Sequence, residues 1–267
     1  MMKPAFSYRE MAPTAKFEAY VLSFWEFVVE SEFAGSIDYE IFPDGCTSLF
    51  YYRNRTRNIN VVGLSSLSLE TVTQQVYGGD QFWGMRISPA ACSDLLRIDP
   101  IKLLRFDASK SEIDLSHLTA GLIDDLTSVP KFEEFVSICE LRISGLIADG
   151  CSYDLAVAEA VRQMAELKGE SRMPHLAQSV GLSVRHLQRR FKASSGLTPK
   201  QFLRARRIRA AAVNIVENRD QNWASRAAEL GFSDQSHLTH EFIAITNRSP
   251  RAFAENLRDV AHGELIK

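Results

Sequence analysis

The stretch LGFSDQSHLTHEF, residues 230–242, decides how the C-terminal part of this chain folds. Gly231 interrupts a helical pattern at a place where a positive φ is needed, which glycine adopts without steric cost. Asp234 then suits the N-cap of a second helix, because its carboxylate accepts from the free backbone N–H groups of the first turn. Leu238 and Phe242, four residues apart, form the apolar side of that helix. The stretch therefore predicts two short helices joined by a tight turn.

The same plan occurs once more, in residues 176–199. The small alanine of each unit lets two helices cross closely, and each glycine forms a turn that a β-carbon would obstruct. The positions expected to hold the first unit together are Ala177, Gly181, Leu187 and Phe191, with Leu176, Ser183, Thr198 and Pro199 around them. Their counterparts in the second unit are Ala227, Gly231, Leu238 and Phe242, with Ala228, Ser233, Ser249 and Pro250 around them. One such pattern is weak evidence, but two of them joined by a helix predict a tandem helix-turn-helix domain.

The charge of the chain is divided unevenly along its 267 residues. Residues 1–170 carry 15 Lys/Arg against 25 Asp/Glu, a net charge of −10, whereas residues 171–267 carry 16 against 8, a net charge of +8. The whole-chain value of −2 hides this difference. An acidic body with a basic C-terminal third indicates that only the last third meets a polyanion.

The N-terminal part has the pattern of a small β domain. Short apolar and aromatic runs between residues 21 and 87 predict strands at 38–42, 47–52, 57–62, 67–77 and 81–87. Pro43, Asp44 and Gly45 supply turn chemistry between the first two, and residues 78–80 predict a hairpin turn between the last two. Several short strands at close spacing predict an antiparallel barrel or sandwich.

Two apolar stripes at helical spacing follow, in residues 115–126 and 132–147. They either pack on the strands of the same chain or form the seam of a dimer, and periodicity does not separate the two. Asp149 to Ser152 is the best linker candidate. The predicted divisions are a β domain at 1–110, a helical dimerisation or packing segment at 111–150, and an all-α domain at 151–260.

With these motifs the sequence resembles the AraC/XylS family of bacterial transcription regulators over residues 152–258. The matching positions are Leu176, Ala177, 181–183, 187–192, 196–199 and 206–211, then Ala227, Ala228, 230–238, Phe242, Ser249 and Pro250. Residues 20–25, 43–45 and 86–89 are similar, less specifically, to the cupin-like sensory domains of one branch of the family. The resemblance implies an α+β two-domain fold, in which a cupin-like antiparallel barrel with flanking helices precedes two helix-turn-helix units joined by a long helix.

The implied function is sequence-specific regulation of transcription through double-stranded promoter DNA. The family's base-reading positions fall on Arg185, Gln188 and Arg189 in the first unit, and these also lie on the outward side of the helix by periodicity. In the second unit they fall on Gln235, Ser236 and His240, where many relatives carry Arg at the last position. Exposed cations suited to DNA phosphates are Lys192, Arg204 and Arg207. Asn247 stands where relatives commonly have Gly, and asparagine tolerates the left-handed conformation that this turn needs.

No motif indicates catalysis, a cofactor or a metal. Cys46, Cys92, Cys139 and Cys151 are scattered, and residues 1–170 contain a single histidine, His117, so a metal-binding barrel is not expected. Two alternatives stay open: a DNA-repair alkyl-transfer enzyme fused to the same DNA reader, and a thiol-based redox sensor. RNA polymerase, a small apolar or aromatic effector and a second copy of the chain are open as further partners. With no apolar run that could span a membrane and no secretory signal, the sequence predicts a cytoplasmic protein.

Overall fold

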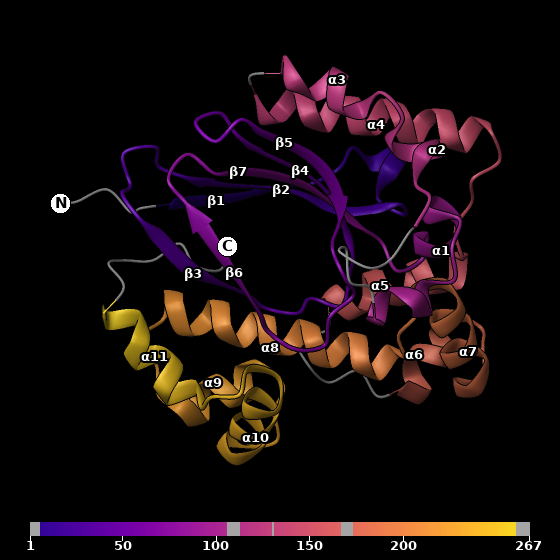
Figure 1. Ribbon diagram of the computed structural model, residues 1–267. Coiled ribbons are helices and arrows are strands. Elements are labelled where there is room, and N and C mark those ends of the chain that lie inside the picture. Colours follow the sequence, from indigo (N-terminus) through magenta and orange to yellow (C-terminus); the bar gives the residue numbers. More distant parts are fainter. Residues whose placement is uncertain (1–5, 106–112, 130, 167–172, 260–267) are drawn as a thin grey trace.

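The structure, a computed structural model, describes residues 6–105, 113–129, 131–166 and 173–259 (Figure 1). Strands occupy the N-terminal part and helices alone the C-terminal part, which confirms the predicted α+β two-domain class. The strands are β1 (Phe6–Met11), β2 (Val21–Val29), β3 (Ser36–Ile41), β4 (Ser48–Asn54), β5 (Ile59–Leu64), β6 (Val72–Tyr77) and β7 (Gln81–Ile87).

The strands form two antiparallel sheets that lie over one another. The larger sheet has the order β1-β2-β7-β4-β5, and β3 pairs with β6 in a sheet of two. The predicted hairpin at residues 78–80 is wrong. The chain does turn there, with the Asp80 N–H donating to the Tyr77 carbonyl at 3.0 Å, but the flanking strands belong to different sheets. Strand β7 is apolar and therefore favours a central position in a sheet that is covered on both faces. Four of the six residues of β6 are exposed, which does not suit such a position.

One face of the larger sheet is covered by helix α4 (Phe132–Ala148) (Figure 1). Phe135 of α4 lies edge-on to Phe24 of β2 at 6.3 Å between ring centroids and 5.7 Å from Trp83 of β7. The apolar stripe of α4 is therefore buried within this chain and is not left free for a dimer seam. The other helical segments of the N-terminal part are η1 (Ala15–Phe17), α1 (Cys92–Leu96), η2 (Pro100–Arg105), α2 (Ser116–Thr119) and α3 (Leu122–Thr127).

The C-terminal part contains two helix pairs joined by the 19-residue helix α8, with one further helix before the first pair and one after the second. Its helices are α5 (Leu155–Glu166), α6 (Met173–Ser179), α7 (Val184–Ser195), α8 (Pro199–Glu217), α9 (Trp223–Glu229), α10 (Gln235–Thr246) and α11 (Pro250–Asp259). The main apolar core does not stop at residue 150, since it runs from the sheet through α4 and α5 to Phe191 and Phe202. The predicted boundaries at 110 and 260 lie outside the described residues.

On its other face, the larger sheet looks toward the β3–β6 pair and α8 (Figure 1). An ion cluster joins the two parts of the chain here. Arg86 of β7, 5% exposed, pairs with Asp44 at 2.5 Å and with Glu10 of β1 at 3.0 Å. Arg209 of α8 reaches the same Glu10 at 2.8 Å. Burial acts to raise the pKa of Glu10, but Arg86 and Arg209 outweigh it and hold that pKa well below its ordinary range.

Replacing Glu10 with Gln should make the stability of the protein less dependent on pH. Because the folded-state pKa lies below the unfolded value of about 4.3, the carboxylate stabilises the fold fully above about pH 5, and this contribution is lost as the pH falls. We expect Glu10→Gln to lower the free energy of unfolding by about 1–3 kcal/mol at pH 7 and by less at pH 3, measured by urea denaturation. Glu30→Gln, at an exposed carboxylate, is the matched control. Equal losses for Glu10→Gln at both pH values would contradict the assignment.

Candidate nucleic-acid interface

The first helix-turn-helix unit is α6 and α7 with the turn between them. Gly181 in that turn has φ +69°, the left-handed conformation predicted for it. The Ser183 hydroxyl accepts from the His186 N–H at 3.3 Å, so Ser183 caps α7 as its position indicated. Leu187 and Phe191 are fully buried and pack α7 against its neighbours. These contacts fix which side of α7 faces outward.

The outward side of α7 is polar and cationic. Arg185, Gln188, Arg189 and Lys192 are all exposed, and among the residues that the structure describes the side chains of these four have no hydrogen-bond or ion-pair partner. Arg190 differs, because it turns back and pairs with Asp154 at 2.6 Å. The base-reading set predicted for the first unit therefore lies together on one free face, with its donors available to a ligand.

The second unit, α9 and α10, repeats this construction. Gly231 has φ +72°, and the Asp234 carboxylate accepts from the His237 N–H at 2.8 Å and caps α10. Gln235, Ser236 and His240 are exposed on the outward side, as predicted. Asn247 ends α10 with φ +56°, so the left-handed turn expected there is confirmed. The structural positions Ala227, Leu238 and Phe242 are fully buried, as is Ala177 in the first unit.

His237 belongs to the packing of the second unit. Its Nδ1 lies 3.1 Å from the Ser233 hydroxyl, and its ring stands edge-on to Phe232 at 5.4 Å between centroids. Within the described ranges no group of three or more His, Cys, Asp and Glu side chains is close enough to hold a metal ion. The contacts of His237 thus have a structural explanation.

Two arginines of α8, predicted to meet phosphates, have partners inside the protein. Arg204 pairs with Glu241 of α10 at 2.5 Å. The Arg207 guanidinium lies 5.2 Å from the centroid of the Phe232 ring and donates to the Gly231 carbonyl at 3.3 Å. Both contacts tie α8 to the second unit, and sequence reasoning missed this role because the partners lie 24 to 37 residues further along the chain. These partners within the protein favour a structural role for both side chains over the predicted contact with phosphate.

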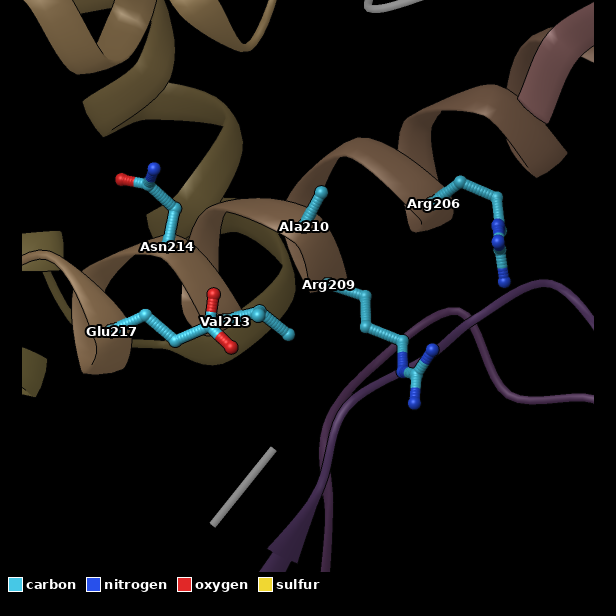
Figure 2. Close-up of a pocket in the computed structure, with 6 residues that line it drawn as sticks. All are labelled: Arg206, Arg209, Ala210, Val213, Asn214 and Glu217. Carbon is cyan, nitrogen blue, oxygen red and sulfur yellow. The ribbon is translucent and has the colours of Figure 1, made fainter. Parts of the chain in front are cut away.

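Side chains along α8 line a pocket (Figure 2). A trough of about 310 Å³ runs along the helix, and its lining residues are Arg206, Arg209, Ala210, Val213, Asn214 and Glu217. In Figure 2 the guanidinium groups of Arg206 and Arg209 extend toward the N-terminal strands. Sequence periodicity placed these arginines on α8 without indicating that they face the other part of the chain.

Comparison with known proteins agrees with this geometry. Residues 176–256 match a family model described as a helix-turn-helix domain. The chain is 37% identical over 81 residues to the probable transcription factor PqrA of Proteus vulgaris, and the match covers 30% of this chain and 66% of that protein. The chain thus spans just under two thirds of the length of this curated relative.

Solved structures give weaker similarities. The DNA-binding domain of AdpA, in complex with a target DNA, is 27% identical and covers 38% of this chain and 92% of its own, with a TM-score of 0.35. ToxT from Vibrio cholerae is 11% identical and covers 97% of this chain and 98% of its own, with a TM-score of 0.41. With TM-scores this low, neither structure determines how the domains are arranged here. The repeated helix-turn-helix units, the family match and the similarity to PqrA show that residues 176–256 form a helix-turn-helix domain of the AraC type.

Proposed function

We propose that this protein is a sequence-specific DNA-binding regulator of transcription, in which α7 and α10 each read one major-groove segment. The observation that carries the proposal is that both second helices turn a free polar face outward while their other sides are buried. Arg and Gln match the hydrogen-bonding edges of guanine and adenine, and such side chains enter the groove from the N-terminal part of a recognition helix. A protein with this role acts on the genome, which in a bacterium lies in the cytoplasm.

The two units differ in how strongly they are expected to bind. The outward face of α7 carries Arg185, Arg189 and Lys192, whereas that of α10 carries Gln235, Ser236 and His240. Since cations contribute both guanine recognition and phosphate attraction, the first unit should dominate affinity. The second unit should contribute mainly to specificity. Helices joined through α8 would meet adjacent major grooves on one side of the duplex, about 34 Å apart.

The proposed reading of two patches is tested by selecting sheared genomic DNA on the intact protein at near-physiological salt and sequencing the retained fragments. We expect one shared motif with two conserved patches about one helical turn apart. Diffuse retention that disappears as salt rises would mean binding to phosphate alone and would contradict sequence-specific reading.

The cysteine thiols do not favour the two alternative functions, an alkyl-transfer enzyme and a thiol-based redox sensor. Cys46, Cys92 and Cys139 are buried, and burial raises the pKa of Cys92 to about 12 and those of Cys46 and Cys139 in the same direction. The thiolate is the reactive form in both alkyl transfer and redox sensing, so these side chains are poorly suited to either. Cys151 is partly exposed, and burial raises its pKa as well. We therefore favour a regulator without catalytic activity.

We also propose that the N-terminal domain modulates DNA reading, through a small effector or through dimerisation. Aromatic side chains on the face of the larger sheet opposite α4, such as Trp25, Phe50 and Tyr52, are only partly buried. The trough beside Arg206 and Arg209 adds cationic groups next to apolar ones. Such a combination suits an apolar or aromatic molecule that carries an anionic group. A shift in melting temperature on adding such a ligand would support the proposal.

Truncation of Arg189 should cost specific binding but spare non-specific binding. We expect Arg189→Ala to weaken binding to the selected operator by about 1–3 kcal/mol, the size of one bidentate base contact, and to relax preference at one base position. Competition with random duplex measures the two effects separately, and Arg190→Ala on the inward-turned neighbour is the control for general loss of charge. Equal weakening on operator and random DNA would show that Arg189 contacts only phosphate.

The dependence of DNA affinity on salt concentration should distinguish cationic side chains that are free from those that are paired within the protein. We expect Lys192→Ala to reduce the slope of log K against log salt by about 1, as for one lost phosphate contact. Arg204→Ala should leave this slope unchanged while Arg204 stays paired with Glu241. Titrations at several salt concentrations measure both. A slope reduced by Arg204→Ala would mean that Arg204 leaves Glu241 and binds phosphate in the complex.

A further inference from the structure

The second helix-turn-helix unit contains a core residue that comes from the N-terminal domain. Phe42, which directly follows β3, is 8% exposed and belongs to the same apolar cluster as Leu238 and Phe242. Its ring centroid lies 6.3 Å from that of Phe242 in α10 and 5.3 Å from that of Phe253 in α11. Those two rings are 5.6 Å apart. The three rings therefore form one aromatic cluster that joins the strand end to both helices.

Polar contacts on either side hold Phe42 in this position. Glu40 of β3 pairs with Arg248, whose guanidinium lies 4.7 Å from the centroid of the Phe253 ring. The Thr71 N–H, just before β6, donates to the Ile245 carbonyl at 3.1 Å. That carbonyl is one of the last four of α10, which have no partner within the helix. The N-terminal domain thus satisfies a backbone group at the end of the second recognition helix.

The turn after Phe42 continues along α8 to the first unit. Gly45 has φ +76°, and a β-carbon there would lie 2.6 Å from a ring carbon of Phe202. Phe202, in the first turn of α8, packs on Phe191 of α7 at 5.5 Å between centroids. Residues 40–45, which we call the interdomain turn, therefore touch α8 close to α7 at one end and the second unit at the other.

We propose that Phe42 is a positioning residue for DNA reading: through the interdomain turn, the N-terminal domain holds α10 in the orientation that reading of the second patch requires. The inference rests on the proposed function. The outward residues Gln235, Ser236 and His240 lie in the first two turns of α10, whereas the contacts with Glu40 and Thr71 are made at its C-terminal end. DNA can therefore bind while these contacts stay in place.

Separation of the two domains would be costly for the second unit. It would expose the rings of Phe242 and Phe253, which are buried at 0% and 3% exposure with Phe42 against them. Exposing these apolar rings to water costs free energy, so it opposes separation of the domains. The first unit is fastened separately, since the Ser194 hydroxyl donates to the Pro89 and Ala90 carbonyls at 2.6 and 2.9 Å. Loss of Phe42 should therefore loosen α10 and leave α7 in place.

The experiment compares two duplexes with the full-length protein. One is the operator obtained by selection. The other is the same duplex with the bases that α10 contacts replaced. Those bases are identified as the positions at which Gln235→Ala loses its base preference. The wild type should prefer the intact operator. We expect Phe42→Ala to reduce that preference by about tenfold, the size of one lost base contact, by lowering affinity for the intact operator while affinity for the altered duplex is unchanged. Phe42→Leu should restore most of the preference.

Two further variants control for folding and for local disturbance. Ile41→Ala changes the neighbouring residue, which is 49% exposed, and should behave as the wild type. Glu40→Gln removes the Arg248 pair without opening a cavity and should shift the preference in the same direction as Phe42→Ala, by less. Unchanged preference in Phe42→Ala and Glu40→Gln, tighter operator binding, or equal weakening on both duplexes would overturn the inference and leave the proposed function intact. A wild type without preference for the operator over random DNA would instead refute the proposed function.

Discussion

Helix α8 must satisfy three partners at once, and this constraint shapes the rest of the structure. Its first turn packs on α7 through Phe202, its middle pairs with α10 through Arg204, and its opposite side meets the N-terminal strands through Arg209. Ala205 and Ala211 are fully buried, and small residues at such positions let neighbouring helices approach closely. One helix therefore carries contacts to both DNA-facing units and to the N-terminal domain.

The sequence predicted the parts of the molecule that depend on local rules. Gly181 and Gly231 adopt the positive φ that their turns require, Ser183 and Asp234 cap the expected helices, and Asn247 replaces a turn glycine at φ +56°. Each of these features is determined within a few residues by backbone sterics and by the free N–H groups of a first helical turn. The exposed faces of α7 and α10 follow from the same periodicity, so the positions of the base-reading candidates were predictable too.

Features that depend on distant partners were not predictable. Strand β1 was missed because its residues alternate only weakly, and it becomes a strand by pairing with β2. The contact of Phe42 with Phe253 spans more than 200 residues, and no local pattern distinguishes Phe42 from other aromatics of the β domain. Arg226 is 1% exposed on α9 and donates to the Asn218 carbonyl at 2.7 Å, although arginine at such a position would be expected at the surface.

The arginines of the C-terminal domain show how burial assigns different roles to one residue type. Those with an acidic partner across an interface, Arg190, Arg204 and Arg209, join elements of the protein. Arg185 and Arg189 have no such partner among the described residues and point away from the core. Charge alone indicated only that the last third of the chain is basic. The pair of Arg209 with Glu10 is partly buried and therefore costly to break, whereas the unpaired arginines are available to a polyanion. A molecule that displaced Arg209 from Glu10 would act on α8 itself, and so on both DNA-facing helices together.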